Sequence, residues 1–348
     1  MPKVSILLPC LNARAFLESR IDSLLAQTFS DWEAIVLDSH STDGSWEYFQ
    51  SIATRDARFK LNQIPREGVY AALNRGVQLA SGEFLHIATC DDAMVPNFLD
   101  AMLKAFQQCP EAGIAACDVS LVDRNNNPLS AEQLVQHLPL SSVNDLLDSG
   151  YVRTSRGNED RINYRRPPHD CLLHFGGRSV YFSLTQLLIR TALAKSAAPF
   201  ETTIGSVADF GWLIRLTNDV GTVHLPEKLA IWRFHGDQLS VHRDPSRLAS
   251  LKMICERALP EICERHQRLL TRNECAALLL PSKALQDFST SKRLRRRLQT
   301  VARVLVMFLE KPAATLRAIR RTRFRLARLR QTLLPMMLQR MGLAPREL

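Results

Sequence analysis

The segment VSILLPCLN, residues 4–12, decides the fold class of this chain. Its first part, Val4–Leu8, is an apolar run of the kind found in strands that are buried on both faces of a sheet. A helical pattern follows at once over residues 13–27. A buried strand that leads directly into a helix predicts the first unit of an α/β sheet.

The same alternation continues to about residue 120. Further strands are predicted at 33–37, 59–63, 84–88 and 113–119, and further helices at 43–54, at 70–80 and from Pro96 onward. Repeated strand–helix–strand units predict a mostly parallel central sheet flanked by helices. Ligands of such sheets bind at the carboxyl ends of the strands, so residues 9–12, 38–43 and 89–92 should meet at one rim.

Composition excludes several classes of protein. The chain has 348 residues, of which 46% are hydrophobic and 23% charged, as expected of a folded protein. No apolar run reaches the ~18 residues of a membrane-spanning helix. Eight cysteines form no C-x-x-C pair, which argues against zinc ribbons. No secretory signal precedes the first strand, so we expect a reducing, cytoplasmic location.

The net charge of +10 is concentrated at one end. Residues 292–348 hold 16 Lys and Arg against 2 Asp and Glu, while the rest of the chain holds 29 against 33. Lys292–Leu298 and Arg317–Arg330 alternate Arg with apolar residues, which predicts basic helices. Such a tail suits an anionic membrane surface, with the protein peripheral on the inner face. The alternative is a helix packed on the body with solvated Arg side chains. No nucleic acid is expected, because no binding motif accompanies the charge.

Two predicted domains follow from these patterns. Residues 1–245 form the α/β domain, with a ligand-binding half at 1–120 and a second half at 120–245. Strand and helix signals return in that second half at 183–190 and 210–216. Its irregular stretch at 120–180 is long enough to line a substrate cleft. Residues 246–348 form a helical, strongly basic extension.

An acidic pair, Asp91-Asp92, stands just after the predicted strand at 84–88. Two adjacent carboxylates are costly unless a cation neutralises them, and Mg²⁺ binds through one or two carboxylates plus substrate phosphates. The alternative is a pair that caps the following helix. Asp38 ends the second strand, where a carboxylate can accept hydrogen bonds from a nucleotide or can cap its own turn.

Four segments, in order, resemble the inverting family-2 glycosyltransferases with the GT-A fold. They are VSILLPCLN at 4–12, VLDSHSTDGS at 36–45, GVYAALNRGVQLASGEF at 68–84 and IATCDDAMVP at 87–96. The resemblance implies the GT-A fold, with residues 1–120 as the nucleotide-sugar half and 120–245 as the acceptor half. It covers residues 3–120 strongly and 180–240 more loosely.

The resemblance also implies a set of donor-binding residues. They are Pro9, Leu11, Asn12, Asp38, Asn74, Arg75, Asp91 and Asp92. Asp38 matches the carboxylate that recognises the base, usually uracil. Asp91 matches the last acid of the family's D-x-D motif, which holds Mn²⁺ or Mg²⁺ on the diphosphate. The chain departs from that motif at its first acid, where Thr89 stands. Asp92 is interpreted as a supporting or helix-capping residue.

Two later segments also match the family. Asp209 precedes WLIRL at 212–216, the position of the general base that deprotonates the acceptor hydroxyl. Its alternative role is a helix cap.

Arg233 and His235 match an R-x-H element, so Arg233 would pair with phosphate and His235 would contact the diphosphate or bind the metal. His169 and Asp170 are a second candidate base, with a surface loop as the favoured interpretation. His174 and residues 176–178 are assigned to the acceptor side.

The sequence therefore predicts metal-dependent, inverting transfer of a sugar from UDP or another nucleoside diphosphate. The acceptor would be a hydroxyl of a glycan or a polyprenol- or lipid-linked molecule in cell-surface polysaccharide synthesis. The alternative is an inactive nucleotide-binding protein recruited through its basic tail, which the missing acid at Thr89 favours. Retention of Asp38, Asp91 and Asp209 together favours the enzyme.

Overall fold

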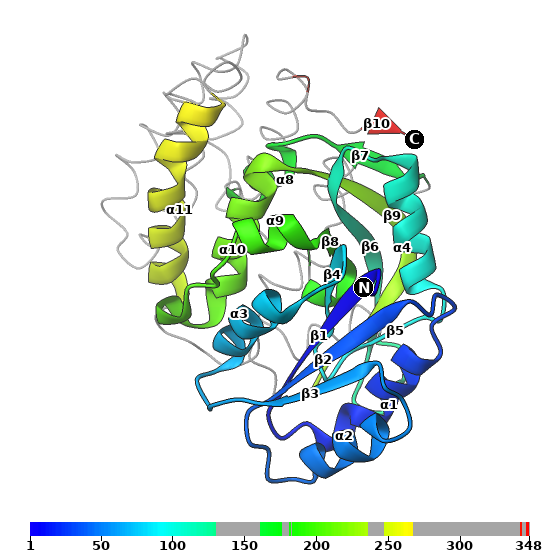
Figure 1. Cartoon of the computed structure of the whole chain (residues 1–348). Coiled ribbons are helices and arrows are strands. Elements are labelled where there is room, and N and C mark those ends of the chain that lie inside the picture. Colours follow the sequence, from blue (N-terminus) through cyan, green and yellow to red (C-terminus); the bar gives the residue numbers. More distant parts are fainter. Residues whose placement is uncertain are drawn as a thin grey trace.

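A computed structural model describes residues 1–129, 161–175, 181, 183–235, 247–266, 342 and 346–347. Its strands form one ten-stranded mixed sheet in the order β10-β7-β9-β6-β8-β4-β1-β2-β3, with β5 paired to β9. Helices flank this sheet (Figure 1). The predicted α/β class with a mostly parallel central sheet is confirmed, and the two predicted halves of the first domain share the sheet.

The amino-terminal elements follow the prediction closely. The strands are β1 (Val4–Cys10), β2 (Trp32–Asp38), β3 (Phe59–Gln63), β4 (Phe84–Ile87), β5 (Ala93–Met94) and β6 (Ala112–Val122). The helices are α1 (Arg14–Leu25), α2 (Ser45–Ala53), α3 (Val69–Leu79) and α4 (Phe98–Gln108). β1 pairs in parallel with β2 and β4, and β2 pairs in parallel with β3. These contacts align the carboxyl ends of all four strands.

The remaining strands extend the sheet beyond β4. They are β7 (Asn163–Arg165), β8 (Leu187–Arg190), β9 (Gly221–Arg233) and β10 (Arg346–Glu347). β8 is antiparallel to both of its neighbours, β4 and β6. β6 therefore runs in the direction of β4, and β9 runs parallel to β6. The ends of β6 and β9 consequently lie at the same edge as the ends of β1, β2 and β4.

The later helical elements cover one face of the sheet. They are α8 (His169–Phe175), α9 (Thr191–Ser196), α10 (Ala208–Asp219) and α11 (Arg247–Arg265), with short 3-10 helices at Leu184–Gln186 (η1) and Thr202–Val207 (η2). Alternation along β1 explains the two-sided core. Leu7 packs with α3 and α10, whereas Ile6 and Leu8 pack with α1, α2 and α4.

Three local predictions need correction. Helix α4 begins at Phe98 rather than at Pro96. The helix predicted at 43–54 begins at Ser45, with Gly44 as the N-cap residue of α2 at φ 90°, and a carboxylate oxygen of Asp43 accepts from Ser45 N at 3.0 Å. A wholly helical segment after residue 246 is contradicted at its end, where β10 is extended and pairs with β7.

The basic tail lies almost wholly outside the described residues, as does the stretch 130–160. α11 confirms the helical prediction over its own length. Within the described ranges, no helix is long and apolar enough to cross a membrane. The boundary predicted at residue 245 stays a prediction.

Candidate active site

The candidate site lies at the edge where the parallel strands end. Residues that follow β1, β2, β4 and β9 meet there because those strands share one direction. β1 and β2 are in register, so Cys10 lies opposite Asp38. The sequence prediction that three separate segments meet at one rim is thus confirmed in the arrangement of the chain.

Asp38 is fully buried at the end of β2. Its Oδ2 accepts a hydrogen bond from Ser41 N at 3.0 Å, which closes the turn after the strand. Its Oδ1 is buried and meets no hydrogen-bond partner in the described part of the chain. A buried carboxylate oxygen without a partner is costly, so this atom indicates a ligand group that donates to it.

The segment after β1 is tied to the turn after β2. Asn12 adopts a left-handed φ of 54°, and its Oδ1 accepts from Thr42 N at 2.8 Å. The Asn12 N–H in turn donates to Ser41 Oγ at 2.9 Å. Pro9 accepts from the Cys90 thiol through its carbonyl, and Leu11 stays half exposed at the edge. These contacts join the segment after β1 to the turn after β2, with Pro9 and Asp38 buried beneath the exposed Leu11 and Asn12.

The metal loop, which we define as residues 89–92, is organised by Asp92. This side chain is buried and accepts three hydrogen bonds, from Thr89 Oγ1 at 2.6 Å, Ser183 Oγ at 3.1 Å and Arg233 N at 3.0 Å. Burial, and then the neighbouring Asp91, raise the pKa of the Asp92 carboxyl to about 7. Asp92 is therefore a structural hub of the loop, and Thr89 is turned inward to it.

Asp91 is the acid of this loop that solvent reaches, with 28% of its side chain exposed. Its Oδ2 lies 3.0 Å from His235 Nε2, and the His235 ring packs on Phe16 with centroids 4.6 Å apart. Burial acts to raise the pKa of Asp91, but the hydrogen bond and charge of His235 outweigh it and lower that pKa overall. The two predicted metal residues, Asp91 and His235, are thus neighbours.

Arg233 was predicted to pair with phosphate, but its side chain is buried against the protein. Its guanidinium donates to the Asp91 carbonyl at 2.7 Å, to Ser19 Oγ at 2.9 Å and to Asn126 Oδ1. The side chain is almost fully buried. Arg233 therefore stabilises the backbone of the metal loop and does not present its charge to a phosphate.

Asn74 and Arg75 lie in the middle of α3 and not at its start. Both ends of the Asn74 amide bond the backbone of Phe200, at 2.9 and 2.7 Å. Arg75 is paired with Glu67 on the surface. The structure thus uses Asn74 to join α3 to the segment that leads into α10, and its predicted contact with the donor stays a prediction.

Asp209 lies in the first turn of α10, one residue beyond the helix's first residue. Its Oδ1 accepts from Phe210 N at 2.7 Å within that turn, whereas the N-cap residue of the helix is Val207 and makes no side-chain capping bond. Tyr70, in the first turn of α3, donates to the Ser206 carbonyl at 3.1 Å. Because α3 starts just after β3 ends, this bond places the start of α10 at the ligand edge of the sheet.

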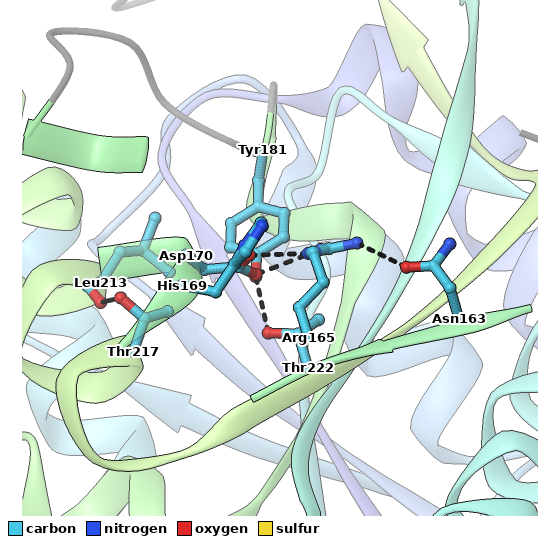
Figure 2. A network of polar contacts seen from close by, with 8 residues as sticks. All are labelled: Asn163, Arg165, His169, Asp170, Tyr181, Leu213, Thr217 and Thr222. Atoms are coloured by element: carbon cyan, nitrogen blue, oxygen red, sulfur yellow. Dashed lines mark hydrogen bonds and ion pairs between the residues drawn. The ribbon is translucent and has the colours of Figure 1, made fainter. Parts of the chain in front are cut away.

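His169 and Asp170 do not lie in a surface loop, so that interpretation is wrong. Both are buried at the start of α8, inside the polar network shown in Figure 2. Asp170 accepts from Arg165 at 2.6 and 3.1 Å and from the Tyr181 hydroxyl, and its Oδ1 lies 2.9 Å from His169 Nδ1. A carboxylate so enclosed holds α8 in place and does not reach a substrate. His174, assigned to the acceptor side, is also buried, and residues 176–178 lie outside the described residues.

The donor set at Asp91 fits a divalent cation shared with a diphosphate. Carboxylate oxygen and imidazole nitrogen are both ligands of Mn²⁺, and Mg²⁺ accepts the carboxylate. The described residues contain no group of three or more His, Cys, Asp or Glu side chains that could hold a metal ion by themselves. Phosphate oxygens and water would have to complete the coordination of the cation.

Comparison with known proteins agrees with this fold. The family described as "Glycosyl transferase family 2" matches residues 5–179, half of the sequence. The chain belongs to this family of glycosyltransferases. S. aureus TarS 1–349 in complex with UDP-GlcNAc has a similar fold, with a TM-score of 0.61 and 16% identity over 91% of this chain and 83% of that one. A mannosyltransferase from Pyrobaculum calidifontis, in complex with GDP-Man and Mn²⁺, reaches 0.50 and 15% over 91% and 84%.

Sequence similarity to the curated relatives covers about a third of the chain, as one of them illustrates. A Campylobacter jejuni protein named GalNAc(5)-diNAcBac-PP-undecaprenol beta-1,3-glucosyltransferase is 35% identical over 106 residues. That alignment covers 30% of this chain and 34% of the relative. The alignment thus spans about a third of the length of this relative.

Proposed function

We propose that this protein transfers a sugar from a nucleoside diphosphate donor to a hydroxyl acceptor, with inversion and with Mn²⁺ or Mg²⁺. The observation that carries the proposal is that two carboxylates lie at one edge of the sheet. Asp91 is partly exposed there, and Asp38 Oδ1 is buried with no hydrogen-bond partner in the described residues. One carboxylate suits a cation on the diphosphate, and the other suits a donor group on the base.

Each residue has a defined task in this proposal. Asp38 accepts a hydrogen bond from the nucleotide base, while Leu11 packs beside it. Asp91 and His235 hold the divalent cation, which stabilises the diphosphate leaving group when bound. Asp209 accepts the proton of the acceptor hydroxyl as that oxygen attacks the sugar carbon on the side opposite the leaving diphosphate. Asp92 and Arg233 keep the metal loop rigid during these steps.

The substrates are proposed by similarity. The names of similar proteins include a UDP-GlcNAc complex, a GDP-Man complex with Mn²⁺ and a glucosyltransferase acting on an undecaprenol-linked glycan. We therefore propose a UDP- or GDP-sugar donor and a glycan or lipid-linked acceptor in glycoconjugate synthesis. A lipid-linked acceptor would bring the chain to a membrane face, and the basic segment 292–348 suits anionic headgroups there.

The direct test is a panel of nucleotide-sugars incubated with the protein and with Mn²⁺, Mg²⁺ or EDTA. Release of the nucleoside diphosphate from one donor, dependent on the added cation, is the expected result. Binding of a nucleoside diphosphate without any transfer or slow hydrolysis of a donor would instead favour the inactive nucleotide-binding protein.

Asp209→Asn is expected to retain donor binding and to lower transfer by about 100-fold or more, because general base catalysis contributes factors of that size. Calorimetry with the donor analogue and turnover assays separate the two effects. Asp219→Asn, at the other end of α10 in a surface pair with Arg265, is the matched control. Full activity of Asp209→Asn would remove this residue from the mechanism.

Asp38→Asn is expected to weaken binding of the nucleoside diphosphate by about tenfold, the size of a lost hydrogen bond to a charged group. Its thermal stability should not fall, because the substitution removes a buried charge whose Oδ1 has no partner within the described residues. Titration calorimetry and melting curves measure both quantities, with the surface variant Asp56→Asn as control. A less stable protein with unchanged affinity would show that Asp38 only shapes its turn.

A further inference from the structure

Arg20 occupies an unusual position for a charged residue. It lies on the buried face of α1, in line with Leu17, Ile21 and Leu24, and its side chain is fully inaccessible to solvent. Its Nε donates to the Thr89 carbonyl at 2.8 Å, and its Nη2 donates to Thr185 Oγ1 at 3.2 Å. An arginine from the first helix therefore reaches the metal loop through the core.

The charge of Arg20 is directed at the same loop. Burial lowers the pKa of its guanidinium, and the negative charges of Asp92 and Asp91 act in the opposite direction. Its third nitrogen, Nη1, is buried and meets no hydrogen-bond partner within the described ranges. A buried cation with one unused donor is costly, so its retention needs a compensating charge, and the two aspartates supply it.

Two guanidinium groups thus hold the metal loop by its backbone. Arg20 binds the carbonyl of Thr89, and Arg233 binds the carbonyl of Asp91. Between them, the side chain of Thr89 is bonded to Asp92 and leaves Asp91 to face solvent. Without Arg20, the Thr89 carbonyl would keep only the longer bond from Asp92 N, at 3.4 Å, and the loop would carry two carboxylates against one guanidinium.

We propose that Arg20 is a positioning residue for the metal loop. It anchors the backbone at Thr89 and offsets the charge of the two aspartates, and so keeps Asp91 turned toward the donor diphosphate. This role rests on the proposed function, because it requires a cation at Asp91. It is a role for a side chain that touches neither donor nor acceptor.

The test is binding of UDP and of GDP to the full chain by titration calorimetry, with Mn²⁺ and with EDTA. For Arg20→Met, we expect the affinity in Mn²⁺ to fall by at least about tenfold, the usual effect of losing a partner that orients a metal ligand. The affinity in EDTA should stay unchanged, because the base contacts at Asp38 do not involve the metal loop. Arg20→Lys should recover part of the loss, since it restores the charge without the forked donor geometry.

Arg190→Met is the matched control. Arg190 also donates to two backbone carbonyls, of Ala112 and Pro110, but it lies opposite Phe84 at the far end of β4. This variant should bind both nucleotides as the wild type does in Mn²⁺ and in EDTA. A loss of Mn²⁺-dependent binding in Arg190→Met equal to that in Arg20→Met would overturn the specific role of Arg20.

Other outcomes distinguish failure of the role proposed for Arg20 from failure of the proposed metal-dependent function. A folded Arg20→Met with wild-type affinity in Mn²⁺, or with equal losses in Mn²⁺ and EDTA, overturns the inference alone. If Arg20→Met does not fold, Thr185→Val removes one anchor of Arg20 and should lower only the Mn²⁺-dependent affinity, by about threefold. No change in a folded Thr185→Val also overturns the inference. A wild type whose nucleotide binding never responds to Mn²⁺ contradicts the proposed function itself.

Discussion

Replacing Asp91 by Asn should reduce sugar transfer by at least about 100-fold, more than the loss of a supporting residue around a metal. Asp91 is the exposed acid of the metal loop, because Thr89 bonds inward and Asp92 is enclosed by three donors. An amide keeps the shape of the side chain but loses the charge that attracts a cation. Initial rates across a Mn²⁺ titration measure the effect.

The design distinguishes a lost metal ligand from a damaged fold. Asp100→Asn, in a surface pair with Lys104 on α4, removes a carboxylate of the same kind outside the site and should leave the rate unchanged. Melting curves should show Asp91→Asn folded, since its carboxylate is partly exposed. Wild-type rates in Asp91→Asn would exclude this residue as a metal ligand and would leave His235 as the remaining proposed ligand.

The largest effect on stability is expected at Asp170. Replacement by Ala should lower the free energy of unfolding by about 3–5 kcal/mol, the cost of leaving one partner of a buried ion pair uncompensated. Arg165 would remain charged and buried, and the Tyr181 hydroxyl would lose its carboxylate acceptor. Urea titration followed by circular dichroism gives the difference directly.

Two further variants sharpen this experiment. Glu201→Gln breaks an exposed ion pair with Arg257 and should cost less than about 1 kcal/mol. The double variant Arg165→Met with Asp170→Leu should be more stable than Asp170→Ala, because no buried charge is left without a partner. A cost for Asp170→Ala as small as that for Glu201→Gln would mean that the network contributes little to holding α8.

The same network predicts a dependence on pH. Burial acts to raise the pKa of Asp170, but the charge of Arg165 and the hydrogen bond from His169 hold it well below its usual value. The contribution of the ionised carboxylate is therefore present above the unfolded pKa of about 3.9 and is lost as pH falls through the lower folded pKa. The stability difference between wild type and Asp170→Asn should be constant near neutral pH and shrink below about pH 4.

The fold of the first half could be predicted from the sequence because local signals and tertiary structure agree there. The apolar run of β1, the Gly44 turn and the SGEF segment before β4 each mark an element boundary without any knowledge of distant contacts. That these segments share one edge then follows from the common direction of parallel strands. Family resemblance added the roles of Asp38, Asp91 and Asp209, and those roles stay predictions.

What the sequence did not yield depends on long-range contacts. Arg20 reaches Thr89 and Thr185, and Arg233 reaches Ser19 and Asn126, across separations that no local pattern reports. A signal for Arg20 was present, since it falls on the apolar stripe of its helix with Leu17, Ile21 and Leu24. His169 and Asp170 beside two prolines looked like a loop, yet both are buried, with Asp170 bonded to Arg165, Tyr181 and His169.

The inward bond of Thr89 constrains how this motif can change over evolutionary time. Its hydroxyl supplies the proton in the 2.6 Å contact with Asp92, and a carboxylate at position 89 has no proton to supply at neutral pH. An acid at position 89 would therefore have to share a proton with Asp92, whose carboxyl already has a pKa raised to about 7. A substitution to the family's first acid is consequently expected to need a change at position 92 or in its surroundings, so the two positions are coupled.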